Sequence, residues 1–177
     1  MKKSFLIVVD MQNDFIDGSL GSAEAQAIVS PAADLIRKKR AEGYEVIATL
    51  DTHTDEYLST REGKYLPVEH CIKGSEGWQL NPEIKDALEE ALTLEKPTFG
   101  SVKLPGIVAE RAGGDPAPVI ELLGLCTDIC VVSNAMLLKA AFPEADLRVH
   151  AACCAGVTPQ KHEAALETMR SCQIDII

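Results

Sequence analysis

The stretch that decides the fold is Pro-Val-Ile-Glu-Leu-Leu-Gly-Leu-Cys-Thr-Asp-Ile-Cys-Val, residues 118–131. Its apolar first part predicts a buried strand, Gly124 predicts a tight turn, and the residues that follow predict the first turn of a helix. Cys130 then stands where helix N-terminal amides stabilise anions. We therefore expect its thiol to have a lowered pKa and to act as a nucleophile.

Outward from this stretch, the chain alternates between apolar runs and amphipathic segments, which predict strands and helices. The expected strands cover residues 5–9, 46–50, 93–95, 117–123, 147–151 and 174–177, and the expected helices 24–42, 81–92, 105–112, 128–141 and 159–171. Residues 51–81 are predicted to be a long loop, which in a compact domain is usually functional. Six buried strands separated by helices indicate a parallel sheet covered on both faces.

Length and composition fit one domain covering residues 1–177. The chain is long enough for one core, and its 46% hydrophobic and 25% charged residues are ordinary for a globular protein. The net charge of −10 argues against nucleic acid and anionic membranes as partners. The N-terminal apolar run is too short for a signal peptide, and no segment is long enough to cross a bilayer, so we expect a cytoplasmic protein.

Polar residues follow several of the expected strands. Asp10 ends the first strand, Asp51 and His53 follow the second, Lys96 follows the third and Cys130 follows the fourth. Alone, Asp10 would be interpreted as a turn residue and Lys96 as a surface lysine. Because sites in parallel sheets form beyond the carboxyl ends of the strands, we expect these residues to share one edge.

Three segments carry a family resemblance. Val-Val-Asp-Met-Gln-Asn-Asp-Phe around Asp10, Glu-Lys-Pro-Thr-Phe-Gly-Ser around Lys96 and Thr-Asp-Ile-Cys-Val around Cys130 resemble the nicotinamidase and isochorismatase-like cysteine hydrolases. The segments stand in the family's order and spacing, and the likeness covers nearly the whole chain. It implies a three-layer α/β/α fold with a six-stranded, mostly parallel, Rossmann-like sheet.

The resemblance also implies how the site works. The amidases of the family use an Asp-Lys-Cys triad, here Asp10, Lys96 and Cys130. A cis peptide is implied before Cys126, with the backbone amides of Cys126 and Cys130 forming an oxyanion hole. Isochorismatases that act on an enol ether lack this cysteine, so its presence favours amide chemistry.

The expected mechanism follows from these roles. Lys96 supports the thiolate by its charge, and Asp10 takes the thiol proton and returns it to the leaving amine. The thiolate of Cys130 attacks an amide carbonyl while the oxyanion hole stabilises the developing charge. Asp10 then activates water to hydrolyse the thioester.

A second group of residues predicts a metal site. Asp51 and His53, two apart on an extended loop, can point into one space, and carboxylate with imidazole suits zinc, iron or manganese. Two unrelated surface histidines are the alternative. The segment Leu-Pro-Val-Glu-His-Cys-Ile-Lys-Gly-Ser-Glu-Gly, residues 66–77, resembles the nicotinamidase segment that carries the last metal histidine, here His70. His150 and His162 are expected to be structural, and no organic cofactor is expected.

The substrate is less closely defined. Nicotinamidases usually place an aromatic residue just before the metal histidine, where this chain has Pro67, Val68 and Glu69. Phe15 and Phe99 are the candidates to supply aromatic faces instead, although each also fits a core position. Nicotinamide is the leading substrate, and another small amide, such as a carbamoyl compound or a ureide, is the alternative.

The six cysteines leave two other classes of protein open. Their spacing does not fit a zinc ribbon, and buried apolar thiols are the expectation. A redox protein in which Cys130 forms a disulfide with Cys126 is one alternative, and a non-catalytic metal- or ligand-binding relative is the other. We expect a homo-oligomer with a small-molecule amide as its partner.

Overall fold

The computed structural model describes residues 3–177, which form one six-stranded parallel sheet with strand order β3-β2-β1-β4-β5-β6. All five strand pairs are parallel. The strands are β1 (Ser4–Val9), β2 (Glu45–Asp51), β3 (Leu92–Lys96), β4 (Val119–Leu125), β5 (Asp146–Ala155) and β6 (Asp175–Ile176). The parallel sheet predicted from the alternating pattern is confirmed.

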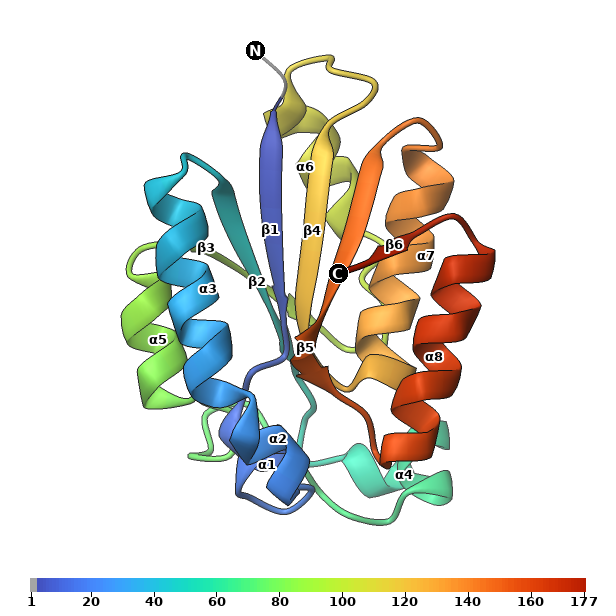
Figure 1. Cartoon of the computed structure of the whole chain (residues 1–177). Helices are drawn as coiled ribbons and strands as arrows, with labels where there is room; N and C mark the ends of the chain where they lie inside the picture. Colours follow the sequence, from blue (N-terminus) through green and yellow to red (C-terminus); the bar gives the residue numbers. More distant parts are fainter. Residues whose placement is uncertain (1–2) are drawn as a thin grey trace.

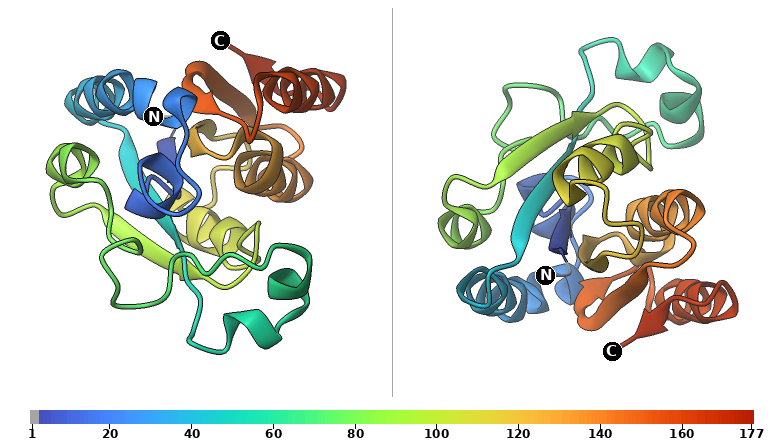
Figure 2. Two further views of the ribbon diagram at one scale, coloured as in Figure 1. Left: turned by 90° about the horizontal axis from the view of Figure 1, so that it is seen from below. Right: turned by 90° about the horizontal axis from the view of Figure 1, so that it is seen from above.

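Helices cover both faces of the sheet, which gives three layers (Figures 1 and 2). Helices α3 and α5 pack together on one face, and α6, α7 and α8 pack on the other, as right-handed crossovers require. The helices are α1 (Asn13–Ile16), α2 (Ala23–Ala27), α3 (Val29–Ala41), α4 (Arg61–Tyr65), α5 (Pro82–Leu88), α6 (Leu104–Ala112), α7 (Val132–Ala141) and α8 (Pro159–Ser171). A 3₁₀ turn (Tyr57–Ser59) and a π-helical turn (Thr127–Val131) complete the set.

The core is centred on β1 and β4, the two middle strands. Residues 5–9 are completely buried, and so are Ile120 and Leu122 on β4. A continuous apolar run of this kind fits a strand covered on both faces, because neither side of the strand meets water. No helix within residues 3–177 is both long and apolar enough to cross a membrane.

The strand order reverses between β1 and β4, and in such sheets the crevice beyond the strand ends at this point is where sites form. Gly124 lets the two strands stay close there. Its φ is +127°, and a Cβ at this position would lie 2.1 Å from the carbonyl oxygen of Val9. Only glycine fits this backbone.

The helix expected over residues 24–42 is wrong as one element, because α2 ends at Ala27 and α3 begins at Val29. The break has a local cause in Pro31. Proline has no N–H to bond the carbonyl of Ala27 four residues earlier, and its ring crowds that carbonyl. The chain therefore turns at Ile28 before the second helix begins.

Other boundaries also differ from expectation. The helix that starts at Pro82 ends at Leu88 rather than residue 92, since Glu89 adopts a positive φ of 52°. The predicted loop 51–81 contains a 3₁₀ turn and helix α4. The helix expected from residue 128 begins as a π-helical turn, and the α-helix starts only at Val132.

Candidate functional site

Asp10, Lys96 and Cys130 meet beyond the carboxyl ends of the strands, as the sequence predicted. The Nζ atom of Lys96 lies 2.6 Å from Oδ2 of Asp10 and 3.5 Å from Sγ of Cys130. All three side chains are buried, with Asp10 and Lys96 at 0% and 1% exposed. Three segments that are far apart in sequence therefore place an acid, a cation and a thiol in one water-poor space.

Asp10 is held by β2 beside it. Its backbone N–H donates to the carbonyl of Thr49 over 3.2 Å, and its Oδ1 accepts from the Thr49 hydroxyl over 2.6 Å. Its φ of 48° is rare for residues other than glycine, although aspartate tolerates it better than most. The Oδ2 atom meets Lys96 as an ion contact and, within residues 3–177, accepts no directed hydrogen bond. This oxygen therefore faces the ammonium group of Lys96 in the buried space.

The charge state of Lys96 follows from its neighbours. Burial acts to lower the pKa of Lys96, but the nearby groups Asp10, Cys130 and Asp51 raise it by more. The second contact of Nζ, 3.4 Å from Oδ1 of Asp51, adds to this effect. Lys96 therefore stays a cation although it is buried.

The expected low pKa of Cys130 is wrong for the resting site. Burial raises its pKa well above the ordinary value, the charge of Asp10 raises it further, and Lys96 only partly offsets both. Burial also raises the pKa of Asp10, against the opposing effect of Lys96. The helix N-terminus does not outweigh the effects of burial and Asp10, because Cys130 is only 4% exposed and lies inside a π-helical turn. The surroundings of the sulfur therefore favour the thiol over the thiolate.

One backbone feature near Cys130 that the family resemblance implied is present in the structure. The peptide bond between Leu125 and Cys126 is cis. The carbonyl of Cys126 accepts hydrogen bonds from the N–H groups of Ile129 and Val131, each over 3.1 Å. Neither bond uses the N–H of Cys130, which lies between these two donors in sequence.

Asp51, His53 and His70 also come together, on the other side of Lys96. The Oδ2 atom of Asp51 lies 3.0 Å from Nε2 of His53 and 3.6 Å from Nε2 of His70. One donor atom from each residue fits within 4.8 Å of the other two, and all three side chains are buried. Burial tends to raise the pKa of Asp51, but the hydrogen bonds from both histidines and the charge of Lys96 lower it overall, so Asp51 is a carboxylate.

These residues fit a divalent metal by their chemistry. Nδ1 of His70 lies 2.8 Å from the carbonyl of Val68, which can only accept, so Nδ1 is the donor and Nε2 is the nitrogen that faces Asp51 and would bind a metal. Two imidazoles and a carboxylate suit zinc, iron or manganese.

Sequence reasoning missed Glu62, Gln12 and Asp14. Oε1 of Glu62, on α4, lies 3.7 Å from Nε2 of both His53 and His70, and nothing in the sequence pattern marks it. Gln12 accepts from the N–H of Asp51 and donates to its carbonyl, over 2.7 and 2.9 Å. Asp14 accepts a hydrogen bond over 2.7 Å from the backbone N–H of Cys71, the residue after His70. Gln12 and Asp14 follow Asp10 at alternate positions of the motif Val-Val-Asp-Met-Gln-Asn-Asp-Phe. This spacing is the sequence signal that could have identified them.

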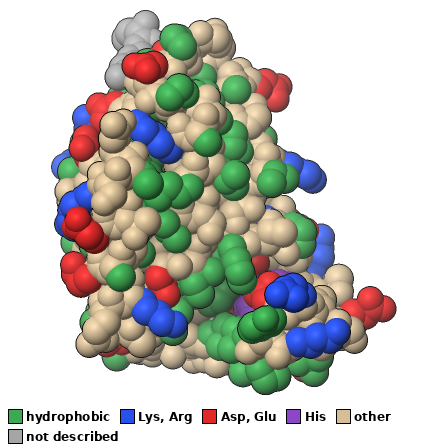
Figure 3. All heavy atoms as spheres, turned by 90° about the vertical axis from the view of Figure 1, so that its right-hand side faces the viewer, with side chains coloured by type: hydrophobic (Ala, Val, Ile, Leu, Met, Phe, Trp, Pro, Cys, Tyr) green, Lys and Arg blue, Asp and Glu red, His purple; other side chains and the backbone are tan. Residues whose placement is uncertain are grey.

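A pocket of about 830 Å³ opens onto both groups. Cys130, Asp51 and His70 line it, together with Phe15 and Phe99, the two predicted aromatic faces. Phe15 is buried with its ring 5.6 Å from that of His70, whereas Phe99 is 46% exposed. Figure 3 shows hydrophobic side chains gathered beside a histidine near the lower end of the molecule, where the strands end.

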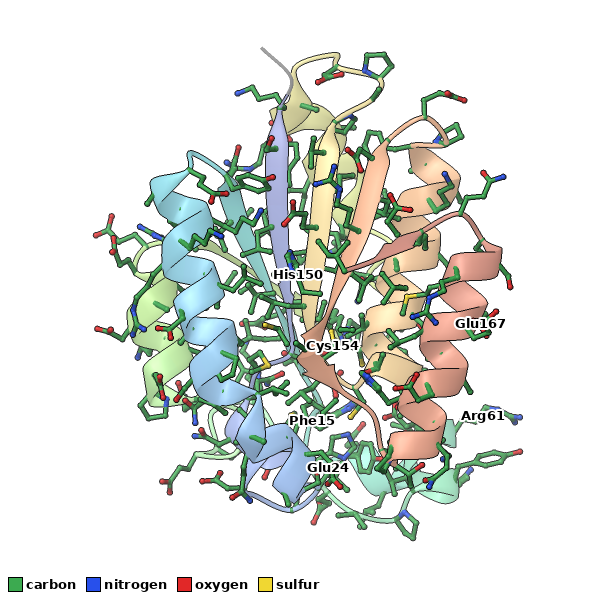
Figure 4. All side chains as sticks on the ribbon, in the orientation of Figure 1. Phe15, Glu24, Arg61, His150, Cys154 and Glu167 are labelled. Carbon is green, nitrogen blue, oxygen red and sulfur yellow. The ribbon has the colours of Figure 1, made fainter. Side chains whose placement is uncertain are left out.

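The other two histidines lie outside both groups of site residues. His150 is on β5, away from the strand ends, and its Nε2 is 2.6 Å from Glu121 (Figure 4). His162 on α8 bonds the hydroxyl of Thr127 over 2.8 Å. Both contacts fit the structural roles expected from the sequence.

Comparisons with known proteins agree with this geometry. The chain is 26% identical over 184 residues to the nicotinamidase/pyrazinamidase of Mycobacterium tuberculosis, covering 97% of both proteins. The pyrazinamidase of Pyrococcus horikoshii, solved in complex with zinc, superposes with a TM-score of 0.82 and 27% identity over 99% of this chain and 98% of that one. For the N-carbamoylsarcosine amidase of Thermoplasma acidophilum, the TM-score is 0.78 with 27% identity over 98% and 95%. The Isochorismatase domain model matches residues 4–177, and the chain belongs to this family.

Proposed function

We propose that the protein hydrolyses a small, nicotinamide-like amide through a thioester on Cys130. Its family and its relatives make it a hydrolase of amide C–N bonds. The observation that carries the cysteine mechanism is the position of Lys96, whose Nζ lies 2.6 Å from Asp10 and 3.5 Å from the sulfur of Cys130. This contact links a proton acceptor, a buried cation and a nucleophile.

In the first half of the reaction, the thiol proton of Cys130 moves to Asp10 as the sulfur attacks the amide carbonyl. Lys96 stabilises the sulfur's charge during this step. The carbonyl oxygen becomes an oxyanion, for which the backbone amides of Cys126 and Cys130 are the proposed donors, each commonly contributing ~3 kcal/mol. Asp10 then gives its proton to the departing nitrogen, the C–N bond breaks, and ammonia leaves.

In the second half, Asp10 is again a carboxylate and takes a proton from a water molecule. The resulting hydroxide attacks the thioester carbonyl, the C–S bond breaks, and the proton on Asp10 returns to the sulfur. The products are a carboxylic acid and the thiol of Cys130. The raised pKa of Asp10 makes its carboxylate a better proton acceptor than an ordinary aspartate, as this mechanism needs.

A divalent metal is proposed beside this centre. Asp51, His53 and His70 would hold it, with Glu62 close enough to both histidines to contribute. A bound metal would supply a Lewis acid that anchors a ring nitrogen or another polar end of the substrate opposite the thiol.

A carbamoyl compound is the second candidate substrate, and two observations favour it. No aromatic residue precedes His70, where residues 67–69 are Pro-Val-Glu. The similar structure from Thermoplasma acidophilum is an N-carbamoylsarcosine amidase. The redox alternative is less well supported, because burial raises the pKa of Cys126 to about 12 and makes it a poor partner in thiol exchange.

The test is ammonia release from nicotinamide and from carbamoyl compounds, with and without added zinc, manganese or iron. Cys130→Ala is expected to abolish turnover, and Asp10→Asn to reduce kcat by roughly 100- to 10,000-fold. Cys172→Ala is the matched control, since this thiol is exposed and free. Full activity in Cys130→Ala would exclude the proposed nucleophile.

A cytoplasmic location and a homo-oligomeric state also remain proposals. The free cysteines Cys71, Cys130, Cys153 and Cys154 are buried thiols of the kind that a reducing compartment preserves. Light scattering on the purified protein measures the oligomeric state directly.

A further inference from the structure

Exposed hydrophobic side chains are concentrated at the opening of the pocket. Within residues 3–177 seven large hydrophobic side chains are exposed, and four of them line this pocket. These four, which we call the apolar mouth, are Tyr65, Leu66, Phe99 and Val157, with exposed fractions of 79%, 38%, 46% and 49%. Exposed hydrophobic side chains gathered around one pocket are typical of ligand-binding sites.

The apolar mouth is built from three separate segments, and the backbone of each makes a hydrogen bond to a side chain from elsewhere in the chain. The carbonyl of Leu66 accepts from the hydroxyl of the buried Tyr57 over 2.9 Å. The carbonyl of Phe99 accepts from Nδ2 of the buried Asn134 over 3.4 Å. The N–H of Val157 donates to Asp128 over 2.9 Å. These contacts connect the backbone of the mouth to side chains of other segments.

The volume of the pocket also indicates that it binds more than a single-ring amide. At about 830 Å³ it lies near the upper end of the range that holds drug-sized ligands. A single-ring amide placed between Cys130 and His70 would fill only its inner part. The outer part, bounded by the apolar mouth, would be left to water against hydrophobic side chains.

We propose that the substrate is an amide whose carbonyl carries an extended apolar group, larger than a single ring. This inference rests on the cysteine mechanism of the proposed function, and it replaces nicotinamide itself with a larger amide as the best substrate. The amide lies at Cys130, and the apolar group extends outward against Tyr65, Phe99 and Val157. Burial of such a group removes apolar surface from water on both partners, which favours the longer substrate.

The experiment compares kcat/KM for ammonia release between matched pairs of amides. One member of each pair is nicotinamide or benzamide. The other member is the same amide with a butyl or phenyl group at the ring position opposite the amide. In the parent protein the larger member is expected to be the better substrate by about tenfold or more. The preference is expected to fall by about tenfold in Tyr65→Ser and in Val157→Ser.

Val102→Ser is the matched control, since Val102 is 80% exposed, lies near Phe99 in sequence and does not line the pocket. It should keep the parent's preference. An equal loss in this variant, or a parent that prefers the smaller amide of every pair, would overturn the inference. If light scattering shows that Tyr65→Ser and Val157→Ser dissociate an oligomer while the preference stays unchanged, a second copy covers the mouth and the inference is wrong.

A second readout does not depend on turnover. Cys130 should be alkylated faster by N-hexyl iodoacetamide than by iodoacetamide, and this ratio should fall in Val157→Ser but not in Val102→Ser. Equal rates for the two reagents would contradict an apolar outer subsite. Failure of this inference can be distinguished from failure of the proposed function. If the protein hydrolyses only small amides and needs Cys130 to do so, only this inference is refuted. If turnover continues without Cys130, the proposed function is refuted.

Discussion

At the scale of single residues, Lys96 connects the parts of the candidate site. One ammonium group contacts Asp10, Asp51 and the sulfur of Cys130, so it joins the proposed nucleophile to the candidate metal ligands. A buried cation is costly unless carboxylates surround it, and here two of them do. Its removal should therefore change the protonation of its neighbours.

Lys96→Met is expected to raise the pKa of Cys130 further. In the parent, burial and Asp10 raise this pKa and Lys96 opposes them, so loss of the cation removes the opposing effect. The rate of alkylation by iodoacetamide, followed by mass spectrometry of the Cys130 peptide, should shift to higher pH. Lys73→Met, which removes an exposed cation paired with Glu95, is the control. An unchanged pH profile in Lys96→Met would mean that Lys96 does not act on the sulfur.

The metal ligands give a second prediction at this scale. Protein purified without chelators should contain about one equivalent of zinc, iron or manganese, and His70→Ala should lose most of it, because a three-ligand site retains metal poorly with two. Glu62→Gln should weaken retention to a smaller degree. His150→Gln is the control, as His150 lies away from the site. Metal at under about a tenth of an equivalent in the parent, with no activation by added metal, would refute the site.

At the scale of elements, the approach of β4 to β1 places the π-helical turn that holds Cys130. Gly124 lies in this contact next to the carbonyl of Val9, and the cis peptide follows at the end of β4. Helix α4 has the corresponding role on the other side, because it carries Glu62 toward the histidines and ends at the apolar mouth. Both short elements thus contribute side chains to the pocket wall.

Gly124→Ala is expected to destabilise the fold by about 3 kcal/mol or more, since a Cβ would both strain the backbone and press on Val9. Gly43→Ala is the matched control. Gly43 also has a positive φ, of 84°, but a Cβ there would meet nothing within 4 Å. Its expected cost is about 1 kcal/mol. Urea unfolding compares the two, and equal losses would mean that the contact with β1 has no energetic role.

At the scale of the whole molecule, a buried ion network joins the two halves of the sheet away from the site. Glu121 on β4 is completely buried. Its carboxylate accepts from Lys39 on α3 and from the hydroxyl of Tyr44, and it contacts His150 on β5 at 2.6 Å. Burial tends to raise the pKa of Glu121, but these partners lower it below its ordinary value.

This network predicts a pH dependence of stability. A carboxylate whose folded pKa is lowered stabilises the fold above its unfolded pKa, and that stability is lost as the pH falls through the folded pKa. The free energy of unfolding should therefore decrease as the pH falls below about 4.5, the ordinary value for glutamate, and less steeply in Glu121→Gln. At neutral pH the variant should be less stable by about 3 kcal/mol.

Glu167→Gln is the control for this network. Glu167 pairs with Arg170 on the exposed side of α8, with its side chain 72% exposed (Figure 4). Exposed pairs contribute little, so unfolding of this variant should follow the parent at every pH. An unchanged acid slope in Glu121→Gln would show that other carboxylates cause the loss of stability.

The sequence by itself determined the parallel sheet, the edge of the sheet at which the candidate site lies and which polar residues meet there. Apolar runs with no alternation predict strands buried on both faces, and parallel strands present all their carboxyl ends at one edge. Polar residues at those ends, such as Asp10 and Lys96, could therefore be placed together without coordinates. The family motifs added the cis peptide before Cys126.

Only the tertiary structure decided the charge states and the remaining contacts. The pKa of Cys130 depends on how much water reaches it, and burial outweighed the helix terminus that the sequence indicated. Glu62 reaches the histidines because α4 folds across the strand ends, and the apolar mouth forms from three segments that no local pattern relates. Periodicity and caps describe interactions between near neighbours in the chain, whereas desolvation and contacts between distant segments arise only when the whole chain packs.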